Sequence, residues 1–117
     1  MTDGTTTIAE IKKYIQNFSD ARGWRRGENA KNLVMALTVE AAELAEIFMW
    51  LYSDNADSVK DNPEEFQHLQ EELADVFWYI CRLCEHYNVD LSRAVEEKAV
   101  LNALKYPVTQ HSEREGM

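Results

Sequence analysis

The sequence is poor in the residues that break helices, form disulfides or span membranes. Its 117 residues include only four glycines, two prolines and two cysteines. The longest apolar runs, residues 47–52 and 76–81, are far shorter than the roughly 20 residues of a membrane-spanning helix. No basic segment followed by an apolar one opens the chain, so it shows no secretory signal. We therefore expect a soluble, cytoplasmic protein with no membrane partner.

The two cysteines, Cys81 and Cys84, form a single C-x-x-C pair. This spacing occurs in redox motifs and in half zinc sites. Here the pair lies in a stretch without glycine or proline, and His86 is the one extra ligand nearby. Four zinc ligands cannot be assembled locally. We interpret both cysteines as small buried hydrophobic residues.

Basic residues are also scarce, with 12 Lys and Arg against 21 Asp and Glu and a formal net charge of −9. Proteins that grip a nucleic-acid backbone usually carry a stripe of Lys and Arg. We therefore expect no nucleic-acid partner. An acidic protein can still bind a phosphorylated small molecule when divalent cations stand between the two negative partners.

Hydrophobic periodicity and capping signals predict four helices and no strand, so the predicted fold class is all-α. Thr7 with Glu10 forms a capping box, Asn62 precedes Pro63 at a helix start, and Asp90 caps the last helix. The predicted helices cover residues 7–22, 30–52, 63–87 and 91–104. Residues 53–62 are expected to be a polar loop. We expect one domain over residues 1–107 and a polar tail over residues 108–117.

Two helical stretches, residues 47–52 and 76–81, are apolar around most of the helix circumference. A helix of a soluble domain normally hides one stripe and exposes the other. Four helices cannot cover both stretches on all sides. We therefore expect the helical bundle to be completed by oligomerisation, as a homodimer or homotetramer.

Two pairs of carboxylates stand out, Glu40 with Glu43 and Glu72 with Asp75, each three residues apart. Residues three apart lie on the same side of a helix, and a short connection favours antiparallel packing of the two helices. The two pairs would then face each other in a mostly apolar interface. Protons or cations must neutralise such a group, and oxygen ligands favour Mg²⁺, with Mn²⁺ as a substitute, over zinc. Either pair alone is also typical of a solvated helix face, so spacing leaves both interpretations open.

Other phosphate and metal motifs are missing. A di-iron bundle needs two Glu-x-x-His motifs, and the sequence has one, at Glu65 and His68. The acidic segment 54–61 lacks the central glycine of an EF-hand. No G-x-x-x-x-G-K loop occurs, so a P-loop is excluded.

The sequence resembles the MazG-like, all-α nucleotide pyrophosphohydrolases, and in that family the dCTP pyrophosphatase-like subgroup. The matching stretches are E-A-A-E-L-A-E-I-F-M-W at residues 40–50, E-E-L-A-D at 71–75 and V-D-L at 89–91. Lys98, Asn102 and the K-Y-P ending at residues 105–107 complete the match. The resemblance implies a four-helix MazG-like unit that cleaves a nucleoside triphosphate to a monophosphate and pyrophosphate, with dCTP as one possible substrate and nucleotide-pool house-cleaning as its role.

By that resemblance, Glu40, Glu43, Glu72 and Asp75 are the Mg²⁺ ligands and catalytic residues. Lys98 and Asn102 would contact the phosphates or sugar, and Lys105 and Tyr106 would lie near the phosphates. The residues expected around the base and the nucleotide are Trp24, Trp50 and Tyr79. Arg82 falls on the same helical face as Glu72, Asp75 and Tyr79, so two interpretations stay open for it, a solvated surface charge and a partner of a carboxylate.

Two other functions remain open. The first is a non-catalytic helical interaction module whose acidic cluster is a docking face. The second is an enzyme of the same build that acts on a phosphoribosyl intermediate of histidine synthesis. The short chain and the tryptophan pair favour a nucleotide.

Overall fold

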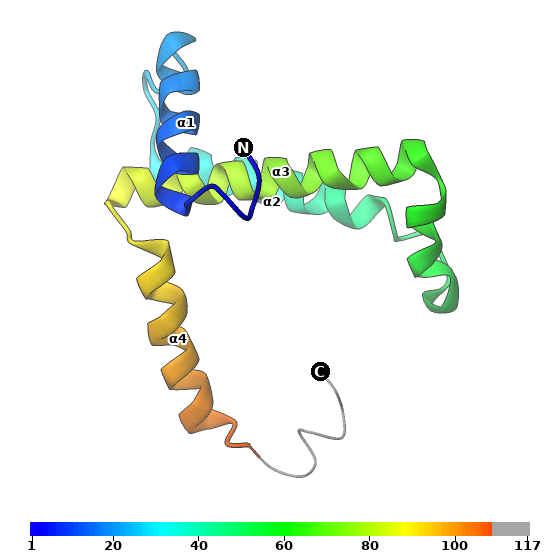
Figure 1. Cartoon of the computed structure of the whole chain (residues 1–117). Coiled ribbons are helices and arrows are strands. Elements are labelled where there is room, and N and C mark those ends of the chain that lie inside the picture. Colours follow the sequence, from blue (N-terminus) through cyan, green and yellow to red (C-terminus); the bar gives the residue numbers. More distant parts are fainter. Residues whose placement is uncertain (109–117) are drawn as a thin grey trace.

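A computed structural model describes residues 1–108 of the chain, and within them it is built from helices alone (Figure 1). The elements are α1 (Ile8–Ala21), α2 (Ala30–Glu46), the 3₁₀ helix η1 (Ser53–Asp61), α3 (Pro63–Tyr87) and α4 (Leu91–Lys105). The predicted all-α class is confirmed. Residues 109–117, which make up most of the predicted tail, lie outside the described residues.

The helix starts follow the capping signals in the sequence. The Thr7 hydroxyl accepts a hydrogen bond from the backbone N–H of Glu10, and the Glu10 carboxylate accepts one from the backbone N–H of Thr7. The side-chain oxygen of Asn62 accepts from the N–H groups of Glu64 and Glu65 at the start of α3. Each cap satisfies backbone donors that have no partner within the first turn of a helix.

The predicted end of the second helix is wrong. α2 stops at Glu46, and residues 47–50 form turns with bonds such as Phe48 N–H to the carbonyl of Ala45. The expected polar loop is the 3₁₀ helix η1, which buries Val59. No proline or glycine marks this boundary in the sequence. The helix ends here because the chain must turn for α3 to pack back along α2. Tertiary packing overrides helix propensity in such a case.

The helices α2 and α3 lie side by side and antiparallel, as expected from their short connection (Figure 1). α1 crosses the end of this pair where α2 begins and α3 ends, and η1 lies at the opposite end. The amine of Lys12 on α1 donates to the carbonyl of Val89, just beyond α3, at 2.7 Å. The buried apolar side chains of α1, α2 and α3 are Ile15, Leu33, Cys81 and Cys84.

Both cysteines are free and buried, in agreement with their interpretation as core residues. Burial raises the pKa of the Cys81 thiol from 9.0 to about 11. The nucleophilic thiolate is therefore disfavoured at neutral pH.

α4 stands away from the other helices (Figure 1) and contains no buried residue. The Cα radius of gyration is 17.5 Å, compared with about 13 Å for a compact domain of 100 residues. None of the described helices combines the length and the apolar character needed to cross a membrane. The described chain is thus an open arrangement in which one helix buries none of its residues.

Candidate functional site

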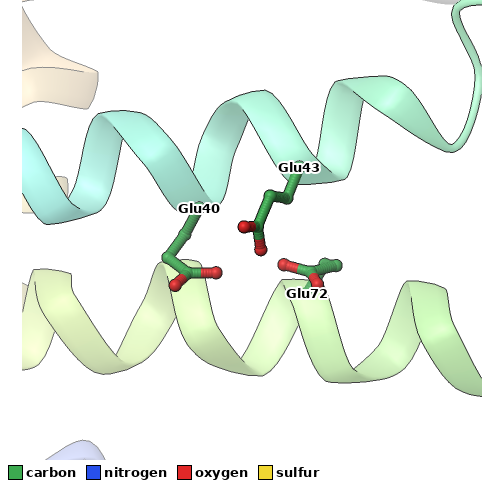
Figure 2. A group of neighbouring side chains, drawn as sticks. All are labelled: Glu40, Glu43 and Glu72. Carbon is green, nitrogen blue, oxygen red and sulfur yellow. The ribbon is translucent and has the colours of Figure 1, made fainter.

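Three of the four predicted carboxylates converge between α2 and α3 (Figure 2). Glu40 and Glu43 reach from α2, and Glu72 reaches from α3. One oxygen from each lies within 4.8 Å of the other two. The i, i+3 spacing on α2 and the antiparallel packing of α3 produce this arrangement.

Two oxygens of the cluster are buried and have no hydrogen-bond partner, namely Oε2 of Glu40 and Oε2 of Glu72. The other oxygen of Glu72 lies 3.2 Å from Nε2 of His68, one turn earlier on α3. Glu72 itself is only 7% exposed. Buried polar groups of this kind are costly unless something binds them. A divalent cation fits this set, because all the donors are carboxylate oxygens.

The charges in the cluster repel one another. Burial raises the pKa of the Glu40 carboxyl from 4.5 to about 7, and the negative charges of Asp75 and Glu43 add to the shift. Asp75, the fourth predicted residue, is not one of the three converging groups. It lies one turn further along α3 and acts on Glu40 through its charge. A proton on Glu40, or a cation in its place, relieves the repulsion.

The predicted nucleotide-binding residues Trp24 and Tyr79 both contact Arg82 on α3. The guanidinium Nη2 of Arg82 donates to the carbonyl of Trp24 at 3.3 Å, and its Cζ lies 5.6 Å from the centre of the Tyr79 ring. Arg82 does pair with a carboxylate, but the partner is Glu28, which precedes α2. The segment that precedes α2, through the Trp24 carbonyl and the Glu28 carboxylate, therefore meets Arg82 of α3.

The other predicted nucleotide-binding residues are not brought to the cluster. Trp50 is 86% exposed just beyond α2. The remaining four lie on or directly after α4 and are all exposed, namely Lys98, Asn102, Lys105 and Tyr106. The amine of Lys105 lies 5.4 Å from the centre of the neighbouring Tyr106 ring. Within this chain, α4 is too isolated to place them beside Glu40 or Glu72.

Sequence reasoning missed the roles of His68 and Glu28. His68 was considered only for a di-iron motif, although its position four residues before Glu72 places the two on one helix face. That spacing was the available signal. The contact of Glu28 with Arg82 spans 54 residues, and no local spacing indicates it.

Comparisons with known proteins agree with this architecture. The profile of the MazG-like family matches residues 35–116. The chain belongs to the MazG-like family. The resemblance seen in the sequence is therefore confirmed.

Individual MazG-like relatives include dCTP pyrophosphatase 1 of Rattus norvegicus, 37% identical over 102 residues that make up 87% of this chain and 60% of the relative. The Homo sapiens protein of the same name is 36% identical over 101 residues, 86% of this chain and 59% of the relative. The chain thus spans about 60% of the length of these curated relatives.

A solved MazG-like neighbour has nearly the same extent as this chain. It is a crystal structure of a pyrophosphatase from Archaeoglobus fulgidus DSM 4304, with a TM-score of 0.78 and 31% sequence identity. The match covers 92% of this chain and 99% of that one. The arrangement of helices therefore matches that of nearly the whole neighbouring chain.

The raised pKa of Glu40 predicts a pH dependence of stability in the metal-free protein. The folded state holds a proton on Glu40 between pH 4.5 and about 7, whereas the unfolded state has released it. The free energy of unfolding should therefore fall as the pH rises through this window. Glu40→Gln should lack this decline when a chelator is present. Melting temperatures of the wild type and the variant, measured from pH 4.5 to 8, should show the difference.

The matched control is Glu46→Gln, because Glu46 is an exposed carboxylate on the same helix. This variant should keep the wild-type pH profile. Identical pH profiles for the wild type and Glu40→Gln would show that Glu40 titrates normally and would contradict the repulsion within the cluster.

Proposed function

We propose that this MazG-like chain is a Mg²⁺-dependent pyrophosphohydrolase that converts a nucleoside triphosphate to a monophosphate and pyrophosphate. The observation that carries the proposal is the cluster of Glu40, Glu43 and Glu72, with buried oxygens that have no partner. The printed names of the relatives, dCTP pyrophosphatase and pyrophosphatase, supply the reaction class and the candidate substrate dCTP.

In this proposal Glu40, Glu43, Glu72 and Asp75 hold the metal. Mg²⁺ prefers oxygen ligands and keeps coordination sites for water and for phosphate oxygens. When bound, such an ion neutralises charge on the phosphates and lowers the pKa of a coordinated water. The carboxylates would orient the ion. Glu72 is held in place by His68, whose Nε2 lies 3.2 Å from Oε1 of Glu72.

The other predicted residues are assigned to the remaining parts of the nucleotide. Tyr79 follows Asp75 by one helical turn and would pack against the nucleotide, and Trp24 would lie near the base. Lys98, Asn102, Lys105 and Tyr106 would contact the phosphate and sugar, and Trp50 the base. In this proposal a second copy supplies the α4 residues and Trp50, which are exposed within one chain.

The exposed apolar surface supports a homo-oligomer. α4 exposes Val100, Leu101 and Leu104 by 59%, 59% and 78%, and their spacing places them on one side of the helix. Contiguous apolar surface of this kind usually marks an interaction site. Symmetric self-association is the simplest way to bury these side chains. It explains the exposed apolar surface without a non-catalytic interaction module. A homodimer or homotetramer is therefore part of the proposal.

A panel of nucleoside triphosphates with Mg²⁺ tests the reaction directly. The panel should include all bases with ribose and deoxyribose, and a phosphoribosylated nucleotide as the alternative substrate class. We expect pyrophosphate rather than orthophosphate as the product. Glu43→Gln should lower the rate by about two orders of magnitude or more, with an unchanged helical circular-dichroism spectrum.

Glu46→Gln, one turn further along α2, is the matched control and should keep wild-type turnover. Pyrophosphate release by Glu43→Gln at the wild-type rate would contradict the assignment of the metal ligands. Orthophosphate as the product, or no product with any triphosphate, would contradict the reaction itself.

Self-association predicts a multiple of the 13.6 kDa chain mass in sedimentation equilibrium. The double variant Leu101→Glu with Leu104→Glu should sediment as a monomer, because two charges would have to be buried in the interface. The variant should also lose pyrophosphohydrolase activity, because a monomer lacks the residues that the second copy supplies. The control Ser53→Glu with Asn55→Glu adds the same charge on exposed positions of η1 and should remain assembled. A monomeric wild type with full activity would contradict the shared site.

A further inference from the structure

The connection between α3 and α4 is short, and hydrogen bonds hold each of its residues. Asn88 ends α3 in the left-handed conformation, with a φ of 56°. The N–H of Val89 donates to the carbonyl of Cys84 at 2.8 Å. The side chain of Asp90 accepts from the N–H of Arg93 at 3.0 Å and so caps the start of α4. The cap of one helix therefore leads directly into the cap of the next.

Lys12 of α1 joins this connection to the rest of the chain. Its amine donates to the carbonyl of Val89 at 2.7 Å, across 77 positions of the sequence. Within residues 1–108, no other hydrogen bond links residues 88–90 to a distant segment. A bond from an ammonium group is charge-assisted and roughly twice as strong as one between neutral groups. The point at which α4 leaves the helix pair is thus tied to α1 through one side chain.

Apolar packing does little to hold the base of α4. A hollow of about 580 Å³ lies beside Lys12, between the first turns of α1 and α4, and both Ile8 and Leu91 line it. Further along, α4 has no buried residue that could anchor it. The direction of α4 is therefore set at its base, by the short connection and by the bond from Lys12.

The length of α4 amplifies any change at its base. From Asp90 to Asn102 the helix advances by roughly 18 Å. A rotation of about 10° at the connection would then move Asn102 by about 3 Å, by the same helix geometry. A misplacement of about 1 Å in a site can lower a rate by about two orders of magnitude. Residues of this helix that must reach a site therefore need a fixed base.

We propose that Lys12 is a positioning residue, whose bond to the Val89 carbonyl sets the direction in which α4 carries its polar side chains to the site of a second copy. This role rests on the proposed function, which assigns Lys98 and Asn102 of that copy to the phosphates and sugar. Lys12 acts through α4 and touches neither the nucleotide nor the metal. A bond that only stabilised the fold would leave the direction of α4 unchanged when it was removed.

Pulsed electron–electron spin resonance measures the direction of α4 without any substrate. Nitroxide labels at the exposed positions Asn17→Cys of α1 and Glu97→Cys of α4 report one distance. Subunit exchange with excess unlabelled protein restricts it to pairs within one copy. The native Cys81 and Cys84 are buried and so resist labelling. Lys12→Met, which keeps the aliphatic stem and loses the donor, should widen the distance distribution by about 3 Å or more.

Lys12→Met should also lower kcat/KM for a hydrolysed triphosphate by about tenfold or more. Its affinity for Mn²⁺, measured by electron paramagnetic resonance without nucleotide, should stay unchanged, because the carboxylate cluster lies between α2 and α3. Lys12→Arg keeps a cationic donor and should restore the narrow distance distribution and most of kcat/KM. The matched control Lys13→Met removes the same charge from the neighbouring, exposed residue and should behave as the wild type in all three measurements.

The outcomes separate the role of Lys12 from the reaction. A wild-type distance distribution or a wild-type kcat/KM in Lys12→Met, or equal effects of Lys12→Met and Lys13→Met, would overturn the positioning role alone. If Lys12→Met loses its helical circular-dichroism spectrum, Lys12→Gln takes its place, because its amide ends one bond short of the lysine amine. A wild type that releases pyrophosphate from no triphosphate would overturn the proposed function and the role of Lys12 with it.

Discussion

Repulsion among carboxylates that are partly removed from water is the constraint on which the site depends. Glu40, Glu43 and Glu72 bring oxygens within 4.8 Å of one another, and Oε2 of Glu40 and of Glu72 is buried without a hydrogen-bond partner. Helix packing holds the groups together although their charges oppose it. A core of aliphatic residues at these positions would stabilise the pair α2–α3 better. The carboxylates therefore lower the stability of the α2–α3 pair and provide a binding site in return.

α3 connects this constraint to the rest of the molecule. Over 25 residues it supplies Glu72 to the carboxylate cluster and Arg82 to the contact with the segment that precedes α2. Because one rigid helix carries both, their separation is set by helix geometry rather than by loops. α4 has the opposite character, since within residues 1–108 it contains no buried residue and exposes apolar and basic side chains. A site shared between two copies would bring the α3 residues of one copy together with the α4 residues of the other.

Much of this could be predicted from the sequence because the signals are local. The capping residues Thr7, Asn62 and Asp90 define helix starts through bonds to the next few residues. The carboxylate spacing, together with antiparallel packing, predicted that the Glu40–Glu43 pair faces the Glu72–Asp75 pair, and all of these residues except Asp75 converge. The end of α2 at Glu46 and the pairing of Glu28 with Arg82 were not predictable in this way. Both depend on contacts between segments far apart in the chain.

The most direct test of the central claim is a crystal structure grown with Mn²⁺, with anomalous diffraction measured at the manganese absorption edge. The account predicts an anomalous peak between α2 and α3, at roughly 2.0–2.2 Å from oxygens of Glu40, Glu43 and Glu72, as for octahedral Mg²⁺ sites. An absence of any peak there, with the three carboxylates turned out into solvent, would contradict it.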